Sequence, residues 1–287
     1  MTAKHKKIGL ALGGGGAKGY AHIGVIKVLL RAGIEIDYIA GTSMGALIGG
    51  YYAATKNISE LEKTALNTKK SDLFSIKDFF KRKDGALFRG KSIANILDHR
   101  LGGVRIENCQ IPFAAVATDV KNGDEIIIKN GDMISAISAS IALPGIFSPV
   151  EVGEQLLMDG GLANPVPADV VRNMGAEYVI AVDVSSKWLT APEEIIKSHD
   201  IYSVISNAFS IMEYQIAKIP LKSADIVLRP PVLTYDWAAF GKASEIIKVG
   251  KKETELNLKE IRMKTGHRAP HKTFADNFLD FILNKPE

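Results

Sequence analysis

The stretch IDYIAGTSMGALIGGYYAA (residues 36–54) places Ser43 between an apolar run and a run of small residues. Residues 36–40 favour a strand and the small residues after the turn favour a helix, so the chain is predicted to turn sharply at Ser43. Gly41 and Gly45 stand two residues to either side, and their lack of a Cβ lets such a turn close. The pattern is typical of a nucleophile elbow, in which a serine hydroxyl projects from a helix N-terminus that favours negative charge. A plain helix N-cap is the alternative interpretation.

A glycine-rich segment, GGGGAKG (residues 13–19), follows the apolar run at residues 8–12 and precedes a helical pattern over residues 20–31. The glycines allow main-chain N–H groups to approach an anion closely at the start of a helix. The anion would be a nucleotide phosphate or the oxyanion of an acyl-transfer intermediate.

Nucleotide binding is the weaker of these two interpretations. Gly14, Gly16 and Gly19 satisfy the dinucleotide fingerprint as written. That fold also needs a carboxylate at the end of the second strand, whereas Asp37 lies early in it and the strand ends in the serine turn. Lys18 lacks the preceding glycine and the following serine or threonine of a P-loop.

The segment MDGG (residues 158–161) places Asp159 at the end of a short apolar run. An aspartate there can reach across the ends of neighbouring strands, although Asp-Gly is also a favoured hairpin turn. Asp119 and Asp183 also follow predicted strands. All three are therefore candidates for the same edge of a parallel sheet, where the sites of α/β proteins usually form.

A serine nucleophile usually works with a histidine, but no histidine here has a strand-end and glycine context. His199, in a polar run, stays open as an alternative base. Only two strand-like runs precede Ser43, too few for the sheet that comes before the elbow in an α/β-hydrolase. A Ser-His-Asp hydrolase is therefore the weaker interpretation. The histidines are His5, His22, His99, His199, His267 and His271.

Taken together and in this order, the three segments resemble those of the patatin-like phospholipases and acyl hydrolases. The resemblance covers roughly residues 8–185 and includes residues 139–150, a segment the family commonly carries before its aspartate. It implies a three-layer α/β/α fold with a central, mostly parallel mixed sheet. Gly13 stands where plant-type members have an aspartate, as in many bacterial members.

The resemblance also implies roles for individual residues. Ser43 would be the nucleophile and Asp159 its proton acceptor, in a dyad without histidine. Because the ordinary pKa of an aspartate is about 3.9, burial against Met158 and Leu162 is expected to raise it. The oxyanion hole would consist of Gly14, Gly15 and Gly16, and the supporting motif residues are Lys18, Gly19, Gly41, Gly45, Gly160 and Gly161.

The implied activity is that of a serine acyl hydrolase of lipid degradation, without cofactor or metal. It would cleave lipid carboxylic esters through an acyl-enzyme, as a phospholipase A or lysophospholipase does. The alternatives are a catalytically silent lipid- or nucleotide-binding protein and a Ser-His-Asp esterase. Head group, acyl length and oligomeric state have no counterpart in the sequence pattern.

Composition agrees with an α/β enzyme, because 287 residues with 46% hydrophobic content can bury a large core. Apolar runs alternate with helical patterns, which favours a mostly parallel sheet covered on both faces. Asn122-Gly123 predicts an antiparallel hairpin within it. Residues 8–172 are predicted to form the catalytic core, and residues 173–287 to complete the same domain with a further strand and helices.

Charge and apolar patterning bear on location and partners. The net charge of +4 permits attraction to anionic lipid. The first apolar run is too short for a signal peptide or membrane span, so a cytoplasmic protein is expected, with possible peripheral contact at the inner membrane face. Cys109 is the single cysteine, so no internal disulfide is expected.

Three further stretches have helical or basic patterns. Residues 71–90 combine aromatics with cations, as a lid or a membrane-docking element does, but an amphipathic helix packed on the core is the preferred interpretation. The apolar stripe along residues 201–216 is likewise predicted to pack in the core. The basic run at residues 248–272 lacks the aromatics that stack on bases, so no nucleic-acid partner is expected.

Overall fold

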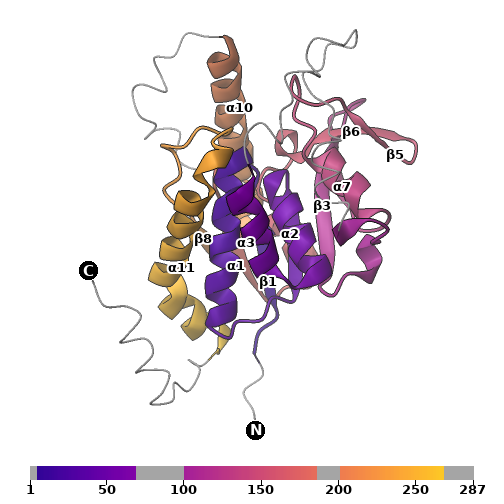
Figure 1. The fold of residues 1–287 in the computed structure, drawn as a ribbon. Coiled ribbons are helices and arrows are strands. Elements are labelled where there is room, and N and C mark those ends of the chain that lie inside the picture. Colours follow the sequence, from indigo (N-terminus) through magenta and orange to yellow (C-terminus); the bar gives the residue numbers. More distant parts are fainter. Residues whose placement is uncertain (1–4, 69–99, 186–200, 268–287) are drawn as a thin grey trace.

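The computed structural model describes residues 5–68, 100–185 and 201–267, which are coloured in Figure 1. The stretch at residues 71–90 falls outside these ranges, as do His99, His199 and His271. Within the described ranges, no helix combines the length and the apolar character that crossing a bilayer demands.

Eight strands form one mixed sheet: β1 (Ile8–Leu12), β2 (Tyr38–Thr42), β3 (Phe113–Asp119), β4 (Glu125–Ile128), β5 (Val150–Val152), β6 (Gln155–Asp159), β7 (Tyr178–Val182) and β8 (Ile226–Leu228). Their order is β5-β6-β3-β2-β1-β7-β8, with β4 also paired to β3. The pairings among β1, β2, β3, β7 and β8 are parallel, whereas β4, β5 and β6 run antiparallel to their partners. The predicted mostly parallel, mixed sheet and its β3–β4 hairpin are confirmed.

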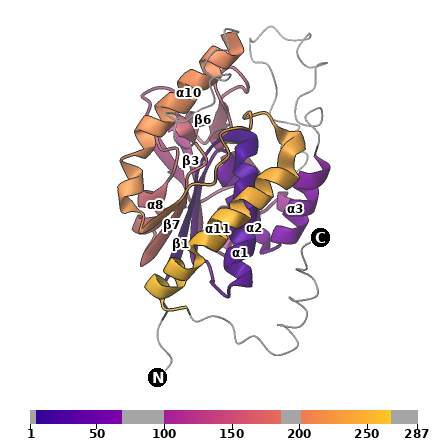
Figure 2. The same ribbon diagram turned by 90° about the vertical axis from the view of Figure 1, so that its left-hand side faces the viewer.

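Helices cover both faces of the sheet, so the three-layer α/β/α architecture is confirmed (Figures 1 and 2). One face carries α1 (Ala21–Arg31), α2 (Met44–Thr55), α3 (Ile58–Asn67), α7 (Met133–Ser140) and α11 (Ala243–Thr265). The other carries α8 (Ala168–Asn173) and α10 (Ile201–Ala217). Single turns of 3₁₀ helix connect them: η1 (Gly16–Tyr20), η2 (Ile106–Asn108), η3 (Gly160–Leu162), η5 (Pro220–Ser223) and η6 (Phe240–Lys242).

The two layers of core differ in side-chain size. Successive residues of a strand point to opposite faces, so Leu10 and Leu12 of β1 pack under α1 and α2 while Ala11 faces α8. The α8 side of the sheet is lined mainly by alanine and valine, which lets this short helix lie close to the strands. Burial on both faces explains why the central strands are apolar without polar alternation.

The last described helix, α11, packs along the first, α1 (Figure 2). Two glycines meet at this crossing: a Cβ at Gly250 would lie 2.8 Å from the carbonyl carbon of Ala21, and one at Gly24 would lie 2.7 Å from the main-chain nitrogen of Lys251. Both positions therefore exclude any side chain unless the helices separate.

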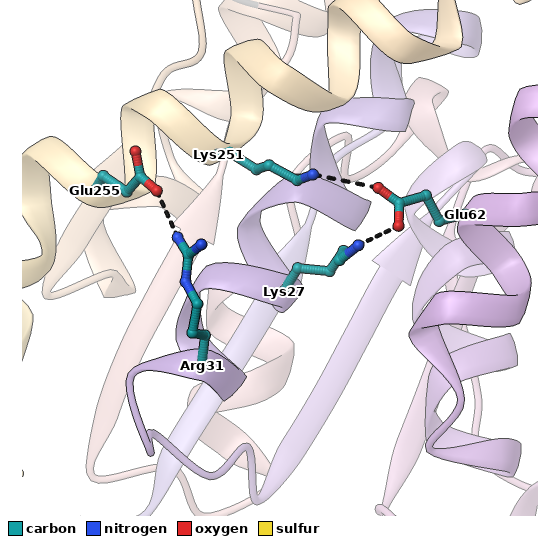
Figure 3. A network of polar contacts seen from close by, with 5 residues as sticks. All are labelled: Lys27, Arg31, Glu62, Lys251 and Glu255. Carbon is teal, nitrogen blue, oxygen red and sulfur yellow. Dashed lines mark hydrogen bonds and ion pairs between the residues drawn. The ribbon is translucent and has the colours of Figure 1, made fainter. Parts of the chain in front are cut away.

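Polar contacts at the surface join α1, α3 and α11 (Figure 3). Glu62 of α3 accepts from Lys27 of α1 and from Lys251 of α11, the latter at 3.3 Å. Arg31 pairs with Glu255 in a more exposed position.

The strands β7 and β8 join the same sheet as β1, so residues after 172 contribute to the same structure as the residues before them. The statement that these residues complete a single folding unit stays a prediction.

Candidate active site

Ser43 is the single residue between β2 and α2. The strand runs two residues further than predicted, because Gly41 stays paired with Leu12 of β1. Ser43 then turns the chain with φ 53° and ψ −122°, a strained conformation for a residue with a side chain. Gly45 lies in the first turn of α2 and allows this helix to approach the glycine-rich loop closely, because a Cβ at Gly45 would lie 2.8 Å from the carbonyl oxygen of Gly13. The predicted strand-turn-helix is confirmed.

The Ser43 hydroxyl donates a hydrogen bond to Oδ2 of Asp159 at 2.7 Å. The other carboxylate oxygen, Oδ1, accepts from the N–H of Gly161 at 2.8 Å. Thr118 anchors the backbone of the same residue, because its hydroxyl donates to the Asp159 carbonyl at 2.9 Å. Each carboxylate oxygen thus has a separate partner, and one oxygen is aimed at the serine.

Asp159 is only 2% exposed, and burial raises its pKa to about 6, against the opposing effect of the hydrogen bonds from Gly161 and Ser43. This direction agrees with the expectation from the sequence. At neutral pH the carboxylate is ionised, so it can accept a proton from Ser43, and it is a stronger base than an exposed aspartate.

The two rival aspartates have other partners. Asp119 accepts from the N–H of Lys121 at 2.7 Å and from Gln155 at 3.3 Å. Asp183 accepts from Ser185 and lies 3.5 Å from the Arg229 guanidinium. Among the described residues, Asp159 is thus the aspartate that hydrogen-bonds Ser43.

The described histidines also lie elsewhere. His5 stacks on His267, and His22 contacts the carbonyl oxygen of Gly13 through Nε2 at 2.8 Å. Burial lowers the pKa of His22 to about 4, so its ring is neutral and donates to that carbonyl. None of the three hydrogen-bonds Ser43 in the described part of the chain. His22 instead helps to hold the glycine-rich loop.

The glycine-rich loop is fixed at its start by main-chain hydrogen bonds. Gly13 donates to Val182 and Gly14 donates to Pro165, both at 3.0 Å. The prediction that Gly14 offers a free N–H therefore needs correction, because the neighbouring loop occupies it. The N–H groups of Gly15 and Gly16 have no hydrogen-bond partner among the described residues. With Gly16 at φ 56°, the loop turns in a way that favours glycine.

Lys18, predicted as a supporting residue, is 8% exposed and points into the protein rather than into solvent. Burial lowers its pKa, while Glu213, Asp236 and Asp183 favour its charged form. Lys18 therefore lies near acidic groups that favour its charged form against the effect of burial. Of these acids, Glu213 lies on α10 and was not predicted as a site residue.

Ser140 is a second residue that sequence reasoning missed. Ser140 is the last residue of α7 and is fully buried. Its hydroxyl accepts a hydrogen bond from the N–H of Ser43 at 2.9 Å and donates one to the carbonyl of Val116 at 2.6 Å. It thereby ties the strained turn to β3. Residues 139–150 stand out in the sequence only by the family resemblance, and a serine among small residues gives no sign of this role.

Ser140→Ala is expected to loosen the turn. Two buried polar groups, the Ser43 N–H and the Val116 carbonyl, would lose their partner, at about 1–3 kcal/mol. We expect the midpoint of thermal unfolding to fall by about 4–8 °C and alkylphosphonylation of Ser43 to slow by about 10-fold or more. Ser135→Ala, nearer the start of the same helix, is the control and should leave the labelling rate unchanged. Equal rates in both variants would contradict the role of Ser140.

A small pocket adjoins this site and is lined by residues from η3 and α10. The stripe along α10 was predicted to pack in the core, and this is wrong for Met212, which is 49% exposed, and for Ala208. The side chains of Phe209, Met212 and Glu213 line the pocket together with Asp159. Residues 209–213 of this helix therefore line the site, whereas Ala217 at its end packs in the core.

The chain has recognisable relatives among known proteins. Residues 10–172 match the family model of patatin-like phospholipase. Neuropathy target esterase sws of Drosophila melanogaster is 32% identical over 275 residues, and patatin-like phospholipase domain-containing protein 6 of Homo sapiens is 31% identical over 268 residues. Each alignment covers 85% of this chain. An uncharacterised NTE family protein of Mycobacterium tuberculosis is 40% identical over 179 residues, 62% of this chain.

The chain spans about a fifth of the fly and human relatives (19% and 20%) and about half of the mycobacterial one (49%). Solved structures match as well, among them two bacterial proteins. VipD from Legionella pneumophila has a TM-score of 0.39 at 14% identity, covering 97% of this chain and 79% of its own. The type III effector protein ExoU has a TM-score of 0.45 at 12% identity, covering 90% and 53%.

Proposed function

The chain belongs to the patatin-like phospholipase family, and on that premise we propose that it is a serine acyl hydrolase of lipid carboxylic esters that uses Ser43 and Asp159. Membership supports lipid ester hydrolysis at the level of the family. The single observation that carries the proposal for this chain is the 2.7 Å hydrogen bond from the Ser43 hydroxyl to Asp159, made at a strained turn before a helix.

The first half-reaction forms an acyl-enzyme. Ser43 Oγ attacks the ester carbonyl carbon while Asp159 accepts the hydroxyl proton, and the carbonyl oxygen becomes negative. The N–H groups of Gly15 and Gly16 are the proposed donors to this oxyanion, with the positive end of α2 adding to the field. Asp159 then gives its proton to the departing alcohol as the carbon–oxygen bond breaks.

The second half-reaction releases the acyl group. Asp159 accepts a proton from a water molecule, whose oxygen attacks the acyl carbon, and a second tetrahedral intermediate forms at the same donors. When it collapses, the proton returns from Asp159 to Ser43 Oγ and a fatty acid leaves. One carboxylate thus serves as base and acid in turn, in line with its raised pKa of about 6.

The proposed substrates are phospholipids or lysophospholipids. Apolar side chains lie beside Asp159, where an acyl chain at Ser43 would contact them: Leu143, Leu162, Phe209 and Met212. The exposed part of Met212 and the net charge of +4 favour approach to an anionic membrane surface. We propose peripheral contact of a cytoplasmic protein with the inner membrane face.

Labelling with an alkyl fluorophosphonate tests the proposal. We expect the wild type to gain one adduct by intact mass, and digestion to locate it on Ser43. A long-chain reagent should react faster than a methyl-chain reagent, because the pocket lining is apolar. Lysophospholipid micelles and diacyl phospholipid vesicles should then yield free fatty acid. An adduct on another residue, or none in folded protein, would sink the Ser43 assignment.

A further inference from the structure

Glu213 lies at the centre of the site although the mechanism above does not use it. It lines the same pocket as Asp159 and Gly161. A Cβ at Gly14 would lie 3.6 Å from its Oε1 and 3.3 Å from the Cβ of Ser43. Glu213 and Ser43 thus border the same small space over the glycine-rich loop. A Cβ at Gly161 would clash with the same Oε1.

The surroundings of this carboxyl oppose its ionisation. Glu213 is half-buried, and desolvation raises its pKa to about 8; the charges of Asp159 and Asp183 add to the rise, while Lys18 acts against it. Lys18 is shared with Asp236 and Asp183, and Asp183 also lies near Arg229. The raised pKa favours the protonated carboxyl, whose O–H can donate a hydrogen bond.

We propose that Glu213 is a third functional residue of the acyl-transfer site: its carboxyl, which borders the same small space as Ser43, donates a hydrogen bond to the ester oxygen that becomes negative when Ser43 attacks. The inference rests on the proposed function and deepens it. Glu213 reaches this space from α10, and the N–H groups of Gly15 and Gly16 in the adjoining loop have no hydrogen-bond partner in the part of the chain that the structure describes. A carboxylic acid that its surroundings keep neutral can serve in this way.

No covalent step is added by this role. The Ser43 proton still goes to Asp159, and Glu213 keeps its own proton throughout. If Glu213 were ionised, it would have no O–H to donate and would place a negative charge beside the developing oxyanion. This charge would oppose the attack of Ser43 on the ester. Reaction at Ser43 should therefore require an ionised Asp159 together with a neutral Glu213, and its rate should be bell-shaped with pH.

The test measures the rate of alkylphosphonylation of Ser43 as a function of pH, because the phosphoryl oxygen takes the place of the ester oxygen. We expect the wild-type rate to rise near pH 6 and to fall near pH 8. Glu213→Gln keeps a neutral donor, so its rate at neutral pH should stay within about threefold of wild type and should not fall near pH 8. Glu213→Ala lacks the donor and should be about 100-fold slower.

Glu255→Gln is the matched control, because this exposed glutamate of α11 pairs with Arg31 of α1. The labelling rate of this variant should still fall near pH 8. A wild-type rate that stays level through pH 8 would overturn the inference, whether or not the variants fold. So would an alkaline fall that persists in Glu213→Gln, or wild-type speed in Glu213→Ala. No adduct on wild-type Ser43 would instead overturn the proposed function itself, so the two failures are distinguishable.

Discussion

Asp159→Asn is expected to slow alkylphosphonylation of Ser43 by about 10³-fold at neutral pH while the fold stays intact. The amide oxygen can still accept from the Gly161 N–H, which donates to Oδ1 in the wild type. The amide nitrogen would then face Ser43, and a donor there cannot accept the hydroxyl proton. The rise in rate near pH 6 should also disappear, because the group that titrates there is gone.

The stability of this variant has a definite sign. Burial raises the pKa of Asp159 from 3.8 to about 6, so the folded state disfavours the charged form. The protonated carboxyl stabilises the folded protein fully at pH values below the pKa of this group in the unfolded chain. This stabilisation is lost as the pH rises through the pKa of Asp159 in the folded protein. At neutral pH, Asp159→Asn should therefore unfold at the same temperature as wild type or at a higher one, which calorimetry can measure.

Asp119→Asn provides the matched control. Asp119 also ends a strand, but its carboxylate accepts from Lys121 and Gln155. We expect its labelling rate to equal that of the wild type. If instead Asp119→Asn abolished labelling and Asp159→Asn did not, the rival aspartate would be the base and the dyad would be wrong.

The features that could be predicted from the sequence are those whose determinants lie close together in the chain. Residues 36–54 specify a strand, one strained residue and a helix, because the apolar run, Ser43 and the two flanking glycines all lie within this stretch. The hairpin at Asn122-Gly123 is equally local. The raised pKa of Asp159 followed from its apolar neighbours, since desolvation depends mainly on burial.

The remaining features depend on contacts between distant segments. Ser140 holds a main-chain group 97 residues earlier, and nothing in its own neighbourhood specifies that partner. The N–H of Gly14 is taken by Pro165, again from a distant loop. Glu213 interrupts an apolar stripe that has the spacing of a core helix, and periodicity alone cannot tell a core contact from the lining of a pocket.

Gly250→Ala is expected to destabilise the protein strongly, although alanine is the better helix former. A Cβ at this position of α11 would lie 2.8 Å from the carbonyl carbon of Ala21 in α1, so the obstacle is a main chain that cannot rotate away. Overpacking of this kind costs about 3 kcal/mol and outweighs the roughly 1 kcal/mol of helix propensity that is gained. The net loss should lower the unfolding midpoint by about 4–8 °C.

The outcome tests whether the residues after 172 complete the catalytic domain. If α11 is part of one cooperative unit, a single unfolding transition should move to lower temperature and the labelling of Ser43 should be lost in the same temperature range. Gly241→Ala is the control, because a Cβ there meets nothing within 4 Å. Its midpoint should stay within about 2 °C of wild type. A separate early transition in Gly250→Ala, with Ser43 still reactive above it, would show that α11 unfolds independently of the catalytic core.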